Sequence, residues 1–314
     1  MRNALESFFS DRQSFTTALR LLVFVNLWSL SANLLEFSSL PLASLAAALL
    51  YTVLLFSRRW ILRPAVWALS LGFQIYFLID SLPYAWSFYF IKVYCNLLVL
   101  IVLLAGKDSE VRRAMLRRGA LALIALCFLV AALQKLSTPE FRDASLFYQG
   151  FYHSMFPAEL ASFADTFLGY ENTLGTAADN HIQTVQSIQF QADVGDAIVL
   201  QMPHDLALIR FSKFLSCAAV VVQLTLGIAY LLPIHSAKLQ QCRDLLFFSF
   251  CIIPYWIFQM AFLFGSVFAF MGYAQSQTRL SRCLFLVAIL NLILVGIFRV
   301  PDYFDYFSTI EASE

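Results

Sequence analysis

Apolar residues in this chain fall into blocks about 20 residues long, separated by short polar or proline-containing turns. A helix of about 20 residues crosses a hydrocarbon core of about 30 Å. Lipid offers no hydrogen bonds to the backbone, so each block must satisfy its own peptide groups as a helix. We expect eight membrane spans, near residues 15–36, 40–56, 62–80, 85–105, 114–135, 207–232, 245–271 and 282–299.

The composition agrees with this pattern. Of the 314 residues, 60% are hydrophobic and 13% are charged, and the mean hydropathy is +0.73. A soluble domain of this length could not cover so much apolar surface with so few charges. The strand-like alternation that a membrane barrel needs along the whole chain is absent. The sequence therefore predicts an all-α, polytopic transmembrane helical bundle.

The spans divide the chain into four parts: spans one to five in 1–136, one long extracytoplasmic loop in 137–205, spans six to eight in 206–300, and an acidic cytoplasmic tail in 301–314. Within the loop, Pro157–Leu168 places its apolar residues on one helical face, which predicts an amphipathic helix. Residues 188–202 alternate apolar and polar positions around a Gly-Asp turn, which predicts a small β-hairpin.

The placement of lysine and arginine sets the orientation, because cytoplasmic connections carry an excess of positive charge. With the N-terminus inside, most of the 21 basic residues lie in cytoplasmic segments. Both termini are then cytoplasmic and the long loop faces the other side, as in a bacterial cytoplasmic (inner) membrane protein. Arg279 and Arg282 are exceptions, since this topology puts them in the last outer loop. The net charge of +1 gives no electrostatic basis for nucleic-acid binding.

Ionisable residues near the bilayer are informative because burying a charge in lipid is costly. Six charged side chains from five spans are expected at one depth, the outer boundary of the bilayer: Glu36, Asp80, Lys92, Lys135, Arg210 and Lys213. Four positive and two negative groups above a helical bundle would form a binding site for an anionic or quinone-like ligand. In the alternative interpretation, these side chains reach the lipid headgroups and form structural ion pairs.

The other polar residues in the spans are expected to have structural roles and not catalytic or binding roles. The intramembrane amides are expected to join helices by hydrogen bonds, and they are Asn26, Gln74, Asn96, Gln223, Gln259 and Asn291. No HxH or HExxH spacing indicates a metal site, and the six cysteines form no CxxC pair. We therefore predict no metal.

The stretch Arg112–Tyr148 carries the most distinctive motif of the chain. It reads RRAMLRRGALALIALCFLVAALQKLSTPEFRDASLFY, in which a basic entry and an apolar helix lead into Ala-Ala-x-x-Lys-Leu and then the aromatic Phe141. This pattern resembles the central signature of the HTTM family, the membrane domain shared with vitamin K-dependent gamma-glutamyl carboxylase, with Ala132 in place of the family's glycine. The resemblance implies that Lys135 is an active-site residue on the outer side. It also implies a reduced quinone as cofactor, which nothing else in the sequence identifies.

The resemblance is uneven along the chain. It is weaker in Phe15–Leu30 and in Phe258–Gly272. Ala85 and Trp86 stand where the carboxylases have an Asn-His pair, and Gln259 stands near the position of a histidine in many members. No large lumenal region is expected after the spans. The resemblance thus favours a minimal bacterial-type HTTM protein over a propeptide-guided glutamate carboxylase.

Two functions follow from these observations, and the sequence leaves both open. The first is a membrane enzyme or redox module that acts at the outer leaflet on a lipid-soluble, quinone-like or secreted peptide substrate, with Lys135 as base or anion anchor. The second is a non-catalytic membrane partner, such as a maturation or immunity factor for a secreted peptide, that docks through the 137–205 loop. Transport is less favoured, because the charges gather at one surface and the inner half offers only amides.

Overall fold

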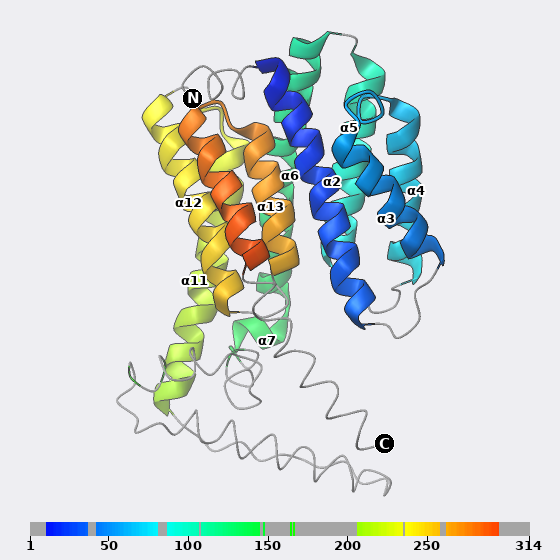
Figure 1. Ribbon diagram of the computed structural model, residues 1–314. Helices are drawn as coiled ribbons and strands as arrows, with labels where there is room; N and C mark the ends of the chain where they lie inside the picture. Colours follow the sequence, from blue (N-terminus) through cyan, green and yellow to red (C-terminus); the bar gives the residue numbers. More distant parts are fainter. Residues whose placement is uncertain are drawn as a thin grey trace, which may run out of the picture. The chain divides into compact units, whose positions relative to one another are not determined.

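The fold is helical throughout the part of the chain that the structure describes. This computed structural model describes residues 11–36, 42–80, 87–106, 108–144, 147, 164, 166, 206–234, 236–257 and 262–294. All regular secondary structure in those residues is helix, which confirms the predicted all-α class (Figure 1). The chain divides into two compact units. The first unit comprises Met1–Cys127, Ala229–Tyr255 and Met260–Glu314, and the second unit comprises Phe128–Ile228 and Trp256–Gln259.

Most predicted spans correspond to one helix each. The helices are α2 (Asp11–Glu36), α3 (Leu42–Phe56), α4 (Pro64–Asp80), α5 (Ser87–Ala105), α6 (Ser109–Ser137), α7 (Pro139–Arg142), α11 (Leu206–Leu231), α12 (Ala237–Ile257), α13 (Phe262–Gln275) and a last helix over 279–294. Among the described residues, α6 and Leu208–Leu231 of α11 are long and apolar enough to cross a membrane. In the most apolar 18-residue stretch of each helix, only 28% and 22% respectively is buried, so most of these apolar side chains remain exposed.

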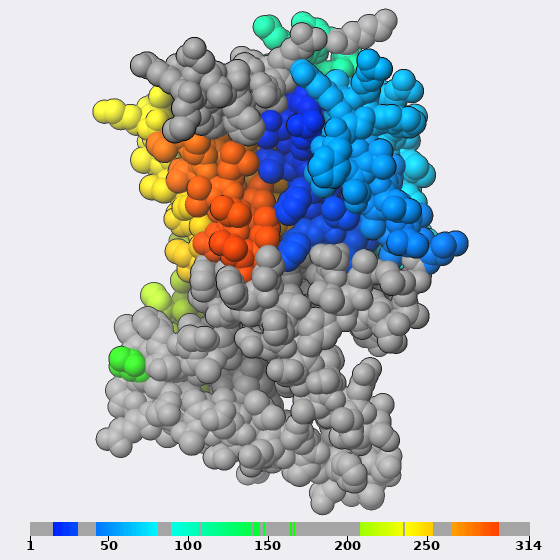
Figure 2. All heavy atoms as spheres, in the orientation of Figure 1, coloured from blue at the N-terminus to red at the C-terminus, as the bar shows by residue number. Residues whose placement is uncertain are grey.

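Helix α3 shows how the apolar surface is distributed in the first unit. Its buried residues follow a spacing of three or four, as expected for one helical face, and they are Ser44, Ala47, Tyr51 and Leu54. The opposite face is also apolar, and Leu42 and Phe56 are 82% and 83% exposed. Blue spheres of α3 accordingly lie on the surface in Figure 2. A helix that is apolar all round is typical of contact with lipid.

The predicted span over 245–271 is wrong. The structure has two helices there, α12 and α13, which lie side by side in Figure 1. A guanidinium nitrogen of Arg243 in α12 lies 3.1 Å from the side-chain oxygen of Gln275 in α13. In one continuous helix these residues would be about 48 Å apart, so the chain must reverse direction between them. Residues 258–261, between the two helices, lie outside the described residues.

The prediction failed because no run of polar, glycine or proline residues separates the two helices in the sequence. Residues 245–271 are almost uniformly apolar, and Arg243 and Asp244, which were assigned to a cytoplasmic connection, lie inside α12. Pro254 is the one local signal, because a proline inside a helix removes a hydrogen bond and often precedes the helix end. Helix α12 ends three residues later, at Ile257.

The last helix starts at the same end of the unit as Arg243. After α13 ends at Gln275, Thr278 accepts a hydrogen bond from the backbone nitrogen of Ser281 at 3.1 Å, which is the geometry of a helix N-cap. The ring of Phe247 in α12 then packs against Phe268 of α13 and Phe285 of the last helix, with centroid distances of 6.1 and 5.6 Å. These contacts hold the three helices together.

Gly272 permits the close approach of α13 and the last helix. A Cβ added there would lie 2.6 Å from the Cζ atom of Phe285, whose side chain is fully buried. We expect Gly272→Ala to lower the free energy of unfolding by about 1–3 kcal/mol, because the rigid ring has no room to move. Denaturant titration of the purified protein in micelles measures this change.

Gly72 provides the matched control for that substitution. It lies within α4, and nothing lies within 4 Å of an added Cβ. Gly72→Ala should leave stability unchanged or raise it slightly, since alanine favours helix over glycine. Equal losses in the two variants would contradict the packing explanation.

The second unit contains the end of α6, α7 and most of α11. Gly227 of α11 faces Leu129 of α6 so closely that a Cβ would approach the Leu129 backbone nitrogen at 3.2 Å. Ala144, just after α7, has a left-handed backbone with a φ of 66°. The predicted amphipathic helix is described only at Ala164 and Thr166, both helical, and the predicted β-hairpin lies outside the described residues.

Candidate functional site

The amine of Lys92 lies in the interior of the first unit. The Lys92 side chain is 1% exposed, and its Nζ donates a hydrogen bond to the hydroxyl of Ser29 on α2 at 2.7 Å. The amine also lies 5.1 Å from the ring centroid of Tyr89, one turn earlier on α5. A lysine so completely buried is rare in proteins.

A chain of hydrogen bonds links the four helices α2–α5 beside this amine. Asn96 is its centre, because its Oδ1 accepts from Ser70 at 2.8 Å and from Asn26 at 3.1 Å. Ser70 uses its proton for that bond, so Tyr51 donates to Ser70 across their 3.1 Å contact and in turn accepts from Gln74 at 2.7 Å. The Asn96 amide nitrogen donates to the backbone oxygen of residue 92 at 2.8 Å. The predicted helix-joining role is thus confirmed for these three amides.

Two carbonyl oxygens of this cluster have no hydrogen-bond partner in the structure. They are Oδ1 of Asn26 and Oε1 of Gln74, and both side chains are 0% exposed. Buried acceptors of this kind are uncommon in native proteins. The interior of α2–α5 therefore presents an amine donor and two open amide acceptors.

The amine of Lys135 has a different environment in the second unit. Lys135 lies in the last turn of α6, is partly buried, and holds its Nζ 5.0 Å from the ring centroid of Phe141 in α7. The hydroxyl of Ser216 on α11 donates to the backbone oxygen of Phe141. Helices α6, α7 and α11 thus fix the aromatic ring against which the amine packs, an arrangement typical of a cation–π contact.

The remaining predicted ligand-binding residues lie at helix ends and on the surface. Asp80 ends α4 and is exposed, and Arg210 and Lys213 are exposed on α11. Glu36 is the last residue of α2, and its side chain lies outside the described ones. The described side chains of Asp80, Arg210 and Lys213 therefore reach the surface of the molecule.

Lys92 differs from the exposed Asp80 of the same unit, because its side chain is buried. Its amine contacts Ser29, which precedes Glu36 at the end of α2 by seven residues, or about 10 Å of helix. The Lys92 amine therefore points into the interior of the first unit and does not reach toward the end of α2. Lys135, Arg210 and Lys213 belong to the second unit.

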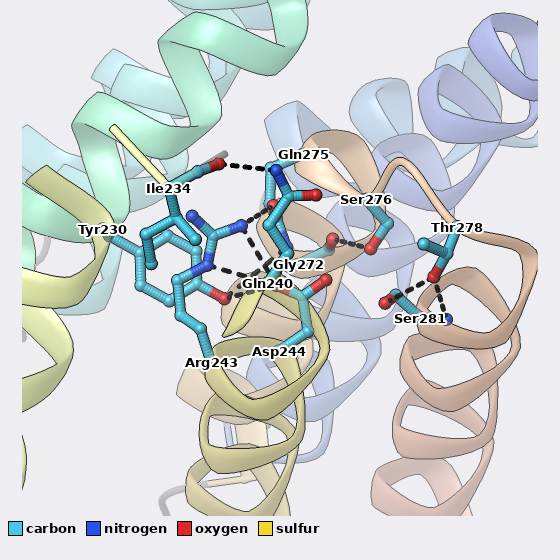
Figure 3. Close-up of polar contacts among 10 residues, drawn as sticks. All are labelled: Tyr230, Ile234, Gln240, Arg243, Asp244, Gly272, Gln275, Ser276, Thr278 and Ser281. Atoms are coloured by element: carbon cyan, nitrogen blue, oxygen red, sulfur yellow. Dashed lines mark hydrogen bonds and ion pairs between the residues drawn. The ribbon is translucent and has the colours of Figure 1, made fainter. Parts of the chain in front are cut away.

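A second buried polar cluster joins the ends of α11, α12 and α13, and sequence reasoning did not identify it (Figure 3). Arg243 and Asp244 form an ion pair at 3.2 Å, and both are at most 9% exposed. Gln275 donates to the Asp244 carboxylate at 2.9 Å, and Tyr230 donates to the same oxygen at 3.3 Å. The Arg243 guanidinium also lies 4.3 Å from the Tyr230 ring centroid. The adjacent opposite charges of residues 243 and 244 were the available signal in the sequence.

Comparison with known proteins adds no relative. No family model, curated protein or solved structure matches the chain. The resemblance to the HTTM family therefore stays a hypothesis that depends on the residues around Lys135.

Proposed function

We propose that the chain is an integral membrane protein, and that the helix ends rich in lysine and arginine face the cytoplasm. Two long apolar helices and the exposed apolar faces of the shorter ones support this. The fold-back of α12 and α13 supports this orientation for Arg279 and Arg282, because both follow a turn at the Arg243 end. In this topology residue 294 lies at the opposite end from residue 11.

We propose that the protein acts at the outer boundary of the bilayer on a lipid-soluble, quinone-like ligand. The observation that carries this proposal is the amine of Lys135 at the end of a candidate span, held against the Phe141 ring within the HTTM-like segment. A partly buried amine can anchor an anion or act as a base on an acidic hydroxyl. Phe141 supplies a flat apolar face next to it, as an aromatic ligand requires.

Replacement of Lys135 tests this proposal directly. The protein in lipid nanodiscs would be labelled with a naphthoquinone bearing a photoreactive diazirine, and the labelled peptides would be mapped by mass spectrometry. We expect saturable labelling of the segment around Phe141, reduced at least about tenfold in Lys135→Ala, because one charge-assisted contact is worth about 1.5–3 kcal/mol. Lys213→Ala is the matched control, since it removes an exposed lysine of the same unit.

Turnover separates an enzyme from a binding protein. The oxidation of the reduced naphthoquinone by dissolved oxygen, followed by absorbance, should be faster with the wild-type protein. Lys135→Ala should lose this acceleration by about 10²-fold or more if the amine is the base. Equal labelling of the wild-type protein and Lys135→Ala would contradict the site. Labelling without turnover would instead favour a non-catalytic partner.

A further inference from the structure

The connection between α3 and α4 carries three arginines on the surface of the first unit. It consists of residues 57–63, which we call the arginine turn, and contains Arg58, Arg59 and Arg63. All three side chains are exposed, and none of them forms an ion pair with another residue that the structure describes. The arginine turn therefore presents three positive charges to its surroundings.

Hydrogen bonds hold the backbone of the arginine turn in one conformation. The backbone nitrogen of Arg63 donates to the backbone oxygen of Trp60 at 3.0 Å. The indole nitrogen of Trp67 in α4 donates to the backbone oxygen of Ile61 at 2.8 Å, and both of these side chains are 0% exposed. The arginines thus extend from a turn that is anchored in the interior. A ligand that binds there loses little affinity to ordering of the backbone.

The arginine turn also continues an apolar strip of α3. The Arg63 guanidinium lies 5.4 Å from the ring centroid of Trp60, which is itself 52% exposed. Before the turn, Leu49, Val53 and Phe56 of α3 are 61%, 53% and 83% exposed. Their spacing of four and three residues places them on one face of the helix. A strip of exposed apolar side chains therefore ends where the three charges begin.

This combination fits a phospholipid with a negatively charged headgroup. Guanidinium groups bind phosphate oxygens through parallel hydrogen bonds, and tryptophan favours the boundary between hydrocarbon and water. An acidic soluble protein would match the charges but would leave the apolar strip uncovered. A zwitterionic lipid would bring its own cation toward three arginines. An anionic phospholipid satisfies the charges and the apolar strip together.

We propose that the arginine turn binds the headgroup phosphate of an anionic phospholipid whose acyl chains follow the apolar strip of α3. The three guanidinium groups neutralise the phosphate, and the Trp60 ring holds that of Arg63 in place. Basic segments next to membrane helices are attracted to anionic lipids of the cytoplasmic leaflet. This site rests on the proposed membrane location of the chain and is independent of the ligand site at Lys135.

Native mass spectrometry of the full-length protein in detergent tests the site with phosphatidylglycerol, phosphatidylcholine and inorganic phosphate. We expect the wild-type protein to retain phosphatidylglycerol in preference to phosphatidylcholine. Arg58→Gln combined with Arg59→Gln should weaken phosphatidylglycerol binding about tenfold or more, because each arginine near a charged headgroup adds a favourable interaction. Arg118→Gln combined with Arg279→Gln is the matched control, since it removes the same charge from exposed positions on other helices. The control should keep the wild-type affinity.

Tryptophan fluorescence locates the bound lipid by a second route. In vesicles, phosphatidylglycerol with brominated acyl chains should quench the fluorescence more strongly than brominated phosphatidylcholine does. Trp60→Phe should remove most of that difference. Equal affinity in the two double variants, or an unchanged quenching difference in Trp60→Phe, would overturn the site. Displacement of phosphatidylglycerol by inorganic phosphate at millimolar concentration would overturn the lipid as its ligand.

Two further measurements separate this site from the proposals above. Release of the protein from membranes by alkaline carbonate would contradict the membrane location and, with it, this lipid site. Naphthoquinone labelling of the segment around Phe141 should persist in Arg58→Gln combined with Arg59→Gln. Loss of that labelling would show that the two substitutions disturb the whole protein, and would overturn the assignment of their effect to the arginine turn.

Discussion

Asp244→Ala is expected to lower the free energy of unfolding by about 3–5 kcal/mol, the largest effect of any single substitution proposed for this protein. The Asp244 carboxylate accepts hydrogen bonds from Arg243, Gln275 and Tyr230. Its removal leaves the Arg243 guanidinium buried without its counter-charge and deprives two further donors of their acceptor. Titration with a denaturing detergent in mixed micelles, followed by circular dichroism, measures the loss.

A double substitution distinguishes the ion pair from simple packing. In Arg243→Met with Asp244→Leu both charges are gone, so most of the stability lost in Asp244→Ala should return. Gln241→Ala is the control, because Gln241 is exposed on the same helix and should leave stability unchanged. A loss below about 1 kcal/mol in Asp244→Ala, the range typical of an exposed pair, would show that water reaches the carboxylate.

Asn96→Ala is expected to lower the free energy of unfolding by about 2–4 kcal/mol. Asn96 accepts from Ser70 and Asn26, so its loss leaves two buried donors without an acceptor. In addition, the series of hydrogen bonds that runs from Gln74 through Tyr51 to Ser70 loses its final acceptor. The same detergent titration applies.

Leu97→Ala is the matched control for this substitution. Leu97 is the next residue of α5 and is 37% exposed, so its truncation removes apolar surface without opening the polar cluster. Its effect should be clearly smaller than that of Asn96→Ala. If the two losses were equal, the hydrogen bonds around Asn96 would contribute nothing beyond packing.

The sequence predicted the helices well wherever polar or proline-containing turns separate apolar blocks. Helices α3 and α4 start within two residues of their predicted positions, because Pro41 and Pro64 mark their beginnings. The reversal between α12 and α13 could not be found this way, because hydropathy measures the apolar length of a segment and says nothing of its direction. Contacts between the two helices, such as that of Arg243 with Gln275, reveal it.

Prediction of the polar sites was limited in the same way. Lys92 was a candidate because a charge inside an apolar block is conspicuous. Its partner Ser29 is 63 residues away in the chain, and no local pattern links the two. Arg243 and Asp244 fell outside the predicted spans, and their partners Tyr230 and Gln275 come from other helices, so no local pattern indicated the cluster.

The wide sequence separation within the Asp244 cluster has a consequence for biosynthesis. Gln275 follows Asp244 by 31 residues, which a ribosome adds in roughly 2–6 s at about 5–20 residues per second. During that interval α12 carries an incomplete cluster, about two turns from its own start. Until Gln275 is made, the Asp244 carboxylate lacks one of its buried donors. Folding of the cluster therefore has to wait for the synthesis of α13.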